Sequence, residues 1–419
     1  MSDERIELTD LANPVFPPAI RETIDMIGAA SAGLELDPAT LMAAASAETG
    51  LDDFGDPWFR EPLDVVCAAY REQGGLSPVG LTMNWAQLQS MLKNRLLIEH
   101  YVAEHPEVTA IEIARPIVIA GLPRTGTTHL HNMLAADPAL RHLPYWESLE
   151  PLLPPAERGM TPDPRIARAA AGLEIVNGAM PNFAAMHEMT ADHVHEEIQL
   201  LALTFSTMFF ETLAPTPRYR DWWDSTDQRP AYAYLKRILQ VLQHARGGER
   251  WVLKSPQHLA QLPAVMATFP DATVVLTHRD PVAVTVSMAT MGTYTARLQL
   301  DPIDPIALGA YWSGRVEHLL TSCDEHRDDV PAAQSIDVRF ADFMADEAAT
   351  VEAIYDRAGQ PLTTEALDAM EAFRQSHPRG RHGAIAYRAG PLGIDIDERR
   401  SALRHYSERF GVANEVVMT

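Results

Sequence analysis

The sequence has little of what stapled or membrane-spanning proteins depend on. Its 419 residues include two cysteines, Cys67 and Cys323, so a disulfide scaffold or a four-cysteine zinc site is excluded. Its longest uncharged, mostly apolar run, residues 198–210, is too short to cross a bilayer. The first ten residues are polar and acidic, without the apolar stretch of a signal peptide. We therefore expect a cytoplasmic protein with no integral membrane segment.

Positive charge is also scarce. There are 34 Lys and Arg residues against 57 Asp and Glu residues, a net charge of −23. This balance disfavours non-specific binding of nucleic acid or an anionic membrane, so we expect neither as a partner. Any bound anion must occupy a local basic pocket. Lysine is the rarest cation, with only Lys93, Lys236 and Lys254 in the chain.

The pattern of apolar residues predicts an α/β fold. Hydrophobic residues make up 46% of the chain and charged residues 22%, as in ordinary globular proteins. Short β-branched runs alternate with helical patterns, which predicts a P-loop-like parallel sheet flanked by helices. The expected strands are 117–120, 251–253, 273–276 and 335–338, and the expected helices are 126–136, 164–179, 192–213, 229–245, 257–268, 281–296, 303–326, 346–358 and 363–375.

The first quarter of the chain has a helical pattern only. Asp37-Pro38 begins one helix, and residues 83–101 repeat apolar side chains with a helical period until Pro106 ends the pattern. We predict a helical N-terminal extension, residues 1–112, packed on a P-loop domain, residues 113–419. Two independent domains are the alternative that the chain length leaves open.

The sequence Gly-Leu-Pro-Arg-Thr-Gly-Thr-Thr at 121–128 lies between the first predicted strand and a helix. This context suits a phosphate cradle, because loop N–H groups and the positive end of the helix face the anion. Nucleotide triphosphatases have Lys where this loop has Thr127, and here the cation, Arg124, lies inside the loop. The loop therefore suggests a transferred group other than the γ-phosphate; an ordinary strand-to-helix turn is the alternative.

Two further cations follow predicted strands. Lys254 comes directly after the strand 251–253, at the edge where open parallel sheets bind ligands. Arg279 follows the strand 273–276, and Ser287 lies eight residues later, about two helical turns on. An arginine with a nearby hydroxyl suits a second phosphate. Together with the glycine loop, they indicate a ligand with two separated phosphate groups.

These motifs, in this order, resemble those of sulfotransferases that use 3′-phosphoadenosine 5′-phosphosulfate, in the branch with tyrosylprotein sulfotransferases and many bacterial enzymes. The resemblance implies transfer of a sulfuryl group from that donor to an acceptor hydroxyl. It further implies that Lys254 stabilises charge on the bridging oxygen. It assigns the 5′-phosphosulfate to Arg124, Thr125, Gly126, Thr127 and Thr128, the 3′-phosphate to Arg279 and Ser287, and a closing loop to Arg381 and Gly383.

The same resemblance places the catalytic base shortly after the glycine-loop helix, where Glu147 stands in this chain. A structural glutamate paired to an arginine is the alternative for that position. His258 is the second candidate base, because cytosolic sulfotransferases use a histidine after the corresponding lysine.

No metal is expected. The cluster of His187, His193, His195, Glu196 and Glu197 lacks an HExxH or similar spacing, and it fits the polar start of the predicted helix 192–213. The apolar side of that helix, with Trp222 and Trp223, hints at a lipophilic or aromatic alcohol as acceptor; another small molecule, a lipid or a glycan stays open. Three rival functions remain: a P-loop small-molecule kinase, a non-catalytic nucleotide-binding module and a metal hydrolase.

Overall fold

The computed structural model describes residues 5–378 and 380–419 and has a five-stranded parallel sheet in the order β2-β3-β1-β4-β5. The α/β prediction and all four predicted strands are confirmed. The edge strand β2 has only two residues, too few to leave a pattern in the sequence. The strands are β1 Ile117–Gly121, β2 Leu140–Arg141, β3 Arg250–Lys254, β4 Thr273–His278 and β5 Ser335–Arg339.

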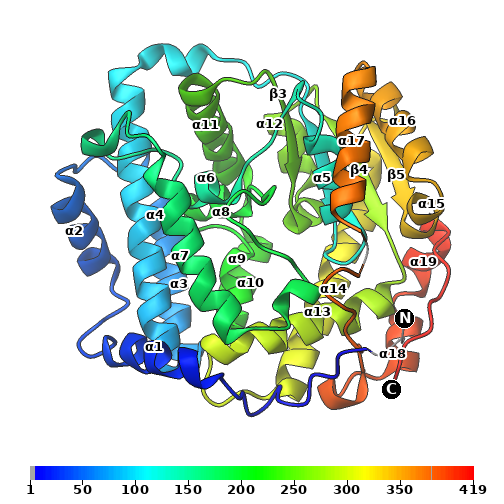
Figure 1. Ribbon diagram of the computed structural model, residues 1–419, viewed down its shortest axis with the longest axis horizontal. Helices are drawn as coiled ribbons and strands as arrows, with labels where there is room; N and C mark the ends of the chain where they lie inside the picture. Colours follow the sequence, from blue (N-terminus) through cyan, green and yellow to red (C-terminus); the bar gives the residue numbers. More distant parts are fainter. Residues whose placement is uncertain (1–4, 379) are drawn as a thin grey trace.

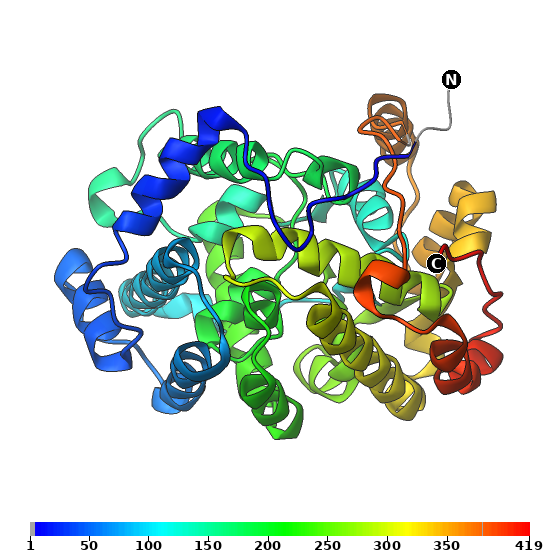
Figure 2. The same ribbon diagram turned by 90° about the horizontal axis from the view of Figure 1, so that it is seen from below.

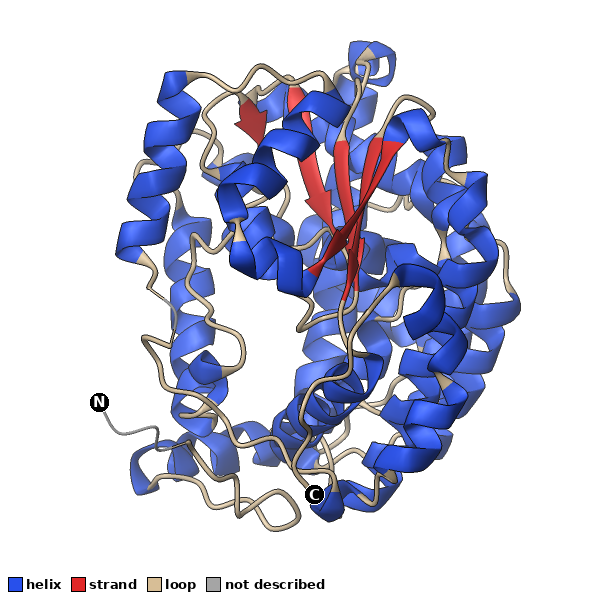
Figure 3. Cartoon of the chain, turned by 90° about the vertical axis from the view of Figure 1, so that its right-hand side faces the viewer, coloured by secondary structure: helices blue, strands red, loops and turns tan. Residues whose placement is uncertain are grey.

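Helices cover both faces of this sheet (Figure 3). Along β1, Ile117 and Ile119 pack on one side with α5, α16 and α17, while Val118 and Ala120 pack on the other side in the main core. Because both faces of the sheet are buried, successive residues of each strand are apolar, which explains the continuous apolar runs in the sequence. The helices after β1 are α5 Thr127–Ala135, α6 Tyr145–Leu149, α7 Pro164–Ala179, α10 Pro217–Ser225, α11 Arg229–Arg246, α12 Leu262–Thr268, α13 Pro281–Thr295, α14 Pro305–His326, α15 Phe340–Ala345, α16 Glu347–Ala358, α17 Thr364–Ser376, α18 Ile396–Ala402 and α19 Arg404–Phe410.

The N-terminal region is helical, as predicted, and forms the blue and cyan side of the molecule (Figure 1). Its apolar side chains belong to the same core cluster as the sheet residues Val118 and Leu253. The extension therefore packs on the rest of the chain, while the boundary at residue 112 stays a prediction. Its helices are α1 Pro18–Ala29, α2 Pro38–Thr49, α3 Arg60–Gln73 and α4 Pro78–Glu104. Within the described residues, we find no helix long and apolar enough to cross a membrane.

The predicted continuous helix 192–213 is wrong. The chain there forms α8, Ile198–Leu201, a 3₁₀ turn, and α9, Phe209–Leu213. Phe205 lies between them with φ 59°, a left-handed conformation that no α-helix can contain. The apolar pattern that suggested a helix instead reflects burial on all sides.

Both ends of the described chain meet near residues 384–389 (Figure 2). Ile6 pairs with Ile385, and Arg388 pairs with Met418, each through an isolated parallel bridge. These pairings bring the C-terminal segment, residues 411–419, beside the carboxyl ends of the strands.

Candidate functional site

A cavity of about 600 Å³ lies at the carboxyl ends of the central strands. Residues after β1, β4 and β5 line it together with residues from the segment 184–194 and with residues 377–378 and 380–383. A larger cavity of about 750 Å³ lies under α18 and α19, but the glycine loop does not reach it. Because open parallel sheets bind ligands beyond their carboxyl ends, we take the first cavity as the candidate site.

The glycine loop follows a tight path in which Arg124, with φ 73°, takes a conformation that favours glycine. Gly126 has φ 86° and precedes α5, and a Cβ there would come within 3.1 Å of Phe340. Gly126, Thr127 and Thr128 line the cavity at the N-terminus of this nine-residue helix. Thr125 differs, because its buried hydroxyl bonds to the Leu122 carbonyl at 2.7 Å rather than facing the cavity.

The structure brings the arginines of two motifs into contact. The Nε of Arg124 donates to the Ser287 hydroxyl at 3.1 Å. The Nη1 of Arg279 donates to the Arg124 carbonyl at 2.6 Å, and its guanidinium lies 4.2 Å from the centre of the Phe340 ring. Residues far apart in the sequence thus place two cations and one aromatic ring around a single cavity, with the buried Ser287 hydroxyl bonded to one of the cations. Such a donor set fits an anion with an attached planar base.

Arg279 also has a partner that the sequence did not predict. Its Nε and Nη2 each donate at 2.7 Å to the two carboxylate oxygens of Glu415, in the C-terminal segment. Asp280 accepts from the Glu415 backbone N–H at 2.6 Å, and Arg400 donates to its carbonyl at 2.7 Å. A carboxylate therefore stands at the arginine expected to bind the second phosphate.

Lys254 ends β3 with its side chain 3% exposed. Its ammonium contacts the Glu196 carboxylate, and its backbone N–H donates to Glu197 at 2.8 Å. Lys254 does not line the cavity itself; it lies close to two histidines that do, His187 and His193.

Burial holds the pKa of His187 well below its usual value. Burial, and after it the charge of Lys254, lowers the pKa of His193 to about 4. The two rings lie with their centres 5.2 Å apart. Both imidazoles are therefore neutral at pH 7. Among residues 5–378 and 380–419, no hydrogen bond contributes to the shifted pKa of His193.

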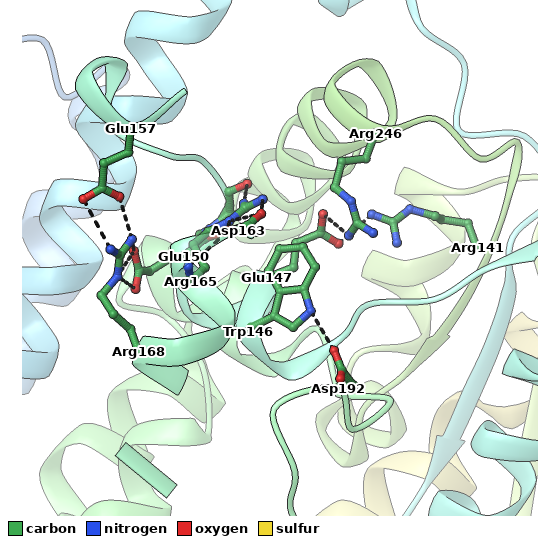
Figure 4. A network of polar contacts seen from close by, with 11 residues as sticks. Arg141, Trp146, Glu147, Glu150, Glu157, Asp163, Arg165, Arg168, Asp192 and Arg246 are labelled. Carbon is green, nitrogen blue, oxygen red and sulfur yellow. Dashed lines mark hydrogen bonds and ion pairs between the residues drawn. The ribbon is translucent and has the colours of Figure 1, made fainter. Parts of the chain in front are cut away.

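The position of Glu147 does not fit the expected base. It is fully buried, it is not among the cavity residues, and its two oxygens accept from Arg141 at 2.5 Å and Arg246 at 2.8 Å (Figure 4). In this structure the Glu147 carboxylate is held by two guanidinium groups and does not line the cavity, so its role as the base stays a prediction. The structural alternative for this residue is the one that the geometry favours.

His258 does not fit a catalytic role either. Its Nδ1 bonds to the Tyr232 hydroxyl at 2.7 Å and its Nε2 to Glu197 at 2.5 Å, and the side chain is 2% exposed. Both ring nitrogens have protein partners and His258 does not line the cavity, so its role as a base stays a prediction, and its contacts tie the turn after β3 to α11.

The late loop closes one side of the cavity. Arg381 and Gly383 both line it, and Arg381 bonds to Glu188 from the facing segment and to the Ser376 carbonyl. Gly383 has φ 87°, which a side chain would strain, and a Cβ there would meet Ile6 at 3.0 Å. Arg381 and Gly383 therefore lie at the same cavity as the glycine loop, and their role in a closing loop stays a prediction.

The residues that hinted at a lipophilic acceptor belong to the core. Leu201, Phe205, Phe210 and Trp223 are fully buried, and the Trp222 indole donates to Glu61 at 3.2 Å on another face. None of them lines the cavity. The side chains that do so opposite the glycine loop are mostly polar: His187, Glu188, Thr190, Asp192 and His193.

Sequence reasoning noticed two of these histidines but assigned them to a helix start. The sequence does contain a signal for these site residues. Three histidines lie within the nine residues 187–195, directly before two glutamates. Nothing local in the sequence marks Glu415 as a partner of Arg279.

A parallel sheet with a glycine loop and two arginines at its carboxyl edge is the arrangement typical of α/β proteins that bind phosphate-like anions. A model described as "Sulfotransferase family" matches residues 116–365, more than half of the chain. The chain therefore belongs to the sulfotransferase family, and it is a transferase of sulfuryl groups.

Two solved structures are similar over most of the chain. Sulfotransferase STF1 from Mycobacterium tuberculosis H37Rv is 32% identical, with a TM-score of 0.77, and the match covers 88% of this chain and 98% of STF1. Sulfotransferase STF9 from Mycobacterium avium is 26% identical, with a TM-score of 0.80, covering 90% of this chain and 97% of STF9. No curated protein matches.

Proposed function

We propose that this sulfotransferase takes its sulfuryl group from 3′-phosphoadenosine 5′-phosphosulfate and transfers it to an acceptor hydroxyl. The observation that carries the proposal is that Arg124 and Arg279, which follow different strands, both line one cavity beside the glycine loop. A ligand with phosphate-like groups at both ends needs two separated cation sites, and the cavity of about 600 Å³ is large enough for a nucleotide.

In this proposal, Gly126, Thr127 and Thr128 bind the 5′-phosphosulfate through loop N–H groups and hydroxyls. Arg279 and Ser287 bind the 3′-phosphate, and Phe340 supports the base. Arg381 and Gly383 close the site over the 3′-phosphate. Thr125 shapes the loop through its own hydrogen bonds.

Arg124 neutralises the charge that develops as the sulfur–oxygen bond to the donor breaks, and the buried Lys254 adds its positive charge from behind the cavity residue His193. These cations make a metal unnecessary for the transfer. A kinase would also need carboxylates that hold Mg²⁺, and its loop would carry Lys in place of Thr127.

We further propose His193 as the proton acceptor, in place of Glu147 and His258. It lines the cavity, it lies near Lys254, and its lowered pKa keeps it neutral and able to accept a proton. An anionic donor bound in the cavity would raise the pKa of His193 and make its imidazole a stronger base. Glu196 then holds Lys254 in position.

Thermal unfolding with 3′-phosphoadenosine 5′-phosphate, ATP and AMP tests the donor class, since a ligand of the native state raises the melting temperature. We expect the largest rise with the 3′,5′-bisphosphate. Arg279→Ala should weaken its binding by about 2 kcal/mol, the scale of a charge-assisted contact, and leave AMP binding unchanged. Equal losses for both ligands would make Arg279 a structural residue.

A transfer assay with a panel of phenols, sterols and sugars tests the base. His193→Gln should lower kcat by about 10²- to 10⁴-fold, while donor affinity stays within about twofold. A similar collapse in Glu196→Gln alone, with His193→Gln active, would move the role to Glu196.

A further inference from the structure

A second cluster of chemistry-bearing side chains lies outside the donor cavity, where α4 and α11 end. His105 follows the last residue of α4, Glu107 lies in the 3₁₀ turn Pro106–Ala110, and His244 is in the last turn of α11. One ligand atom from each of the three side chains lies within 4.8 Å of the others. The sequence separates His244 from the other two by well over a hundred residues, so only the fold brings them together.

The spacing suits a tetrahedral ion. The Nδ1 of His105 is 3.5 Å from an oxygen of Glu107, and the Nε2 of His244 is 3.6 Å from the same oxygen. Two ligands of a tetrahedral zinc ion with bonds of about 2.0 to 2.1 Å are about 3.3 to 3.5 Å apart. Two imidazoles with one carboxylate form a common zinc donor set, and the fourth position is left for water.

A neighbouring side chain orients the imidazole of His244 for metal binding. The Tyr101 hydroxyl bonds to the Nδ1 of His244 at 2.8 Å, which leaves the Nε2 turned toward Glu107. Metal-bound histidines have their second nitrogen held in this way. The three side chains are 37%, 60% and 29% exposed, so an ion and its water have access from solvent.

The local field favours a cation. Both α4 and α11 end here, so the negative ends of two helix dipoles point at the cluster. Glu104 adds a carboxylate nearby, although Arg158 is paired to it at 2.9 Å. His100, one helical turn before Glu104, is 3.4 Å from the Glu104 carboxylate and is not part of the cluster.

We propose that His105, Glu107 and His244 form a binding site for a zinc-like divalent transition metal. The ion ties the end of α4, in the N-terminal extension, to α11. The α11 helix leads into β3, and its Tyr232 holds His258 beside the strand that carries Lys254. The site therefore stabilises the packing behind the donor cavity and takes no part in the transfer.

Zinc titration of the full chain, stripped with EDTA and dialysed, tests the proposal by calorimetry and thermal unfolding. We expect one saturable zinc site, a higher melting temperature with zinc, and no effect of Mg²⁺, which prefers oxygen ligands. His244→Ala and His105→Ala should each weaken zinc binding at least tenfold, and Tyr101→Phe about tenfold. The matched control is His100→Ala, which should bind zinc as the native chain does.

Cobalt substitution gives a second measurement, because the visible spectrum of Co²⁺ reports tetrahedral coordination. Melting of each variant without metal shows whether it is folded. Equal zinc binding by the native chain and the His105→Ala/His244→Ala double variant would overturn the proposal, as would no binding at a large molar excess of zinc. The test involves no nucleotide, so its outcome is independent of the proposed donor.

Discussion

Replacing Glu415 with glutamine tests whether the C-terminal segment competes with the donor. Glu415 accepts two hydrogen bonds at 2.7 Å from the arginine proposed to bind the 3′-phosphate. A phosphate at this arginine must displace the carboxylate or share the guanidinium with it. Glu415→Gln keeps the shape of the side chain and the backbone bonds to Asp280 and Arg400, and it removes the charge together with one of the two oxygens that accept from Arg279.

The free energy that the Arg279–Glu415 contact contributes follows from how exposed the two side chains are. The Arg279 and Glu415 side chains are 23% and 36% exposed, between a buried pair and a surface pair. Surface pairs contribute up to about 1 kcal/mol and hydrogen bonds to charged groups about 1.5 to 3 kcal/mol. We take about 1 kcal/mol for the contact that the phosphate must replace. Affinity for 3′-phosphoadenosine 5′-phosphate should then rise about fivefold in the variant.

Calorimetric titration with this bisphosphate and with AMP is the assay. AMP lacks the 3′-phosphate, so its affinity should not change. Glu408→Gln on α19 is the matched control, because it removes the same charge from the same end of the molecule. A fall in bisphosphate affinity would mean that Glu415 positions Arg279 instead of competing, and no change would mean that the phosphate does not reach this arginine. Either result refutes the reasoning.

Three further predictions concern stability and cofactor needs. Glu147→Gln leaves Arg141 and the half-exposed Arg246 without a carboxylate. It should lower the free energy of unfolding in urea by about 3 kcal/mol, near the low end for a broken buried ion pair, and leave donor binding unchanged. Unchanged stability with loss of turnover would instead support Glu147 as the base. Transfer should survive exhaustive chelation, and a loss restored by Mg²⁺ would favour a kinase. Burial holds the pKa of His131 well below its unfolded value of about 6.5, so the unfolded chain binds more protons than the folded chain below that pH. Acidification should therefore lower the free energy of unfolding by up to about 1.4 kcal/mol per pH unit through this residue. The difference in urea unfolding between pH 7 and 5.5 should be smaller in His131→Gln than in the native chain, whereas His405→Gln, at an exposed residue, should match the native chain.

The sequence alone determined the sheet and the anion-binding motifs. Buried parallel strands need continuous β-branched runs, and a strand that ends in a glycine loop before a helix has few other structures available. The positions of Lys254 and Arg279 at strand ends followed from the same local patterns. The edge strand β2, with two residues, was the strand that local patterns could not reveal.

Tertiary structure decided which charged side chains face the cavity. Arg246 lies 99 residues from Glu147, and Glu415 lies 136 residues from Arg279, so no local pattern relates these partners. An ionised side chain is stable in the interior only when paired, and the available partner therefore decides whether a glutamate becomes a base or a structural anchor. The same holds for the segment 187–213, where burial from every side broke the expected helix and turned His193 toward the cavity.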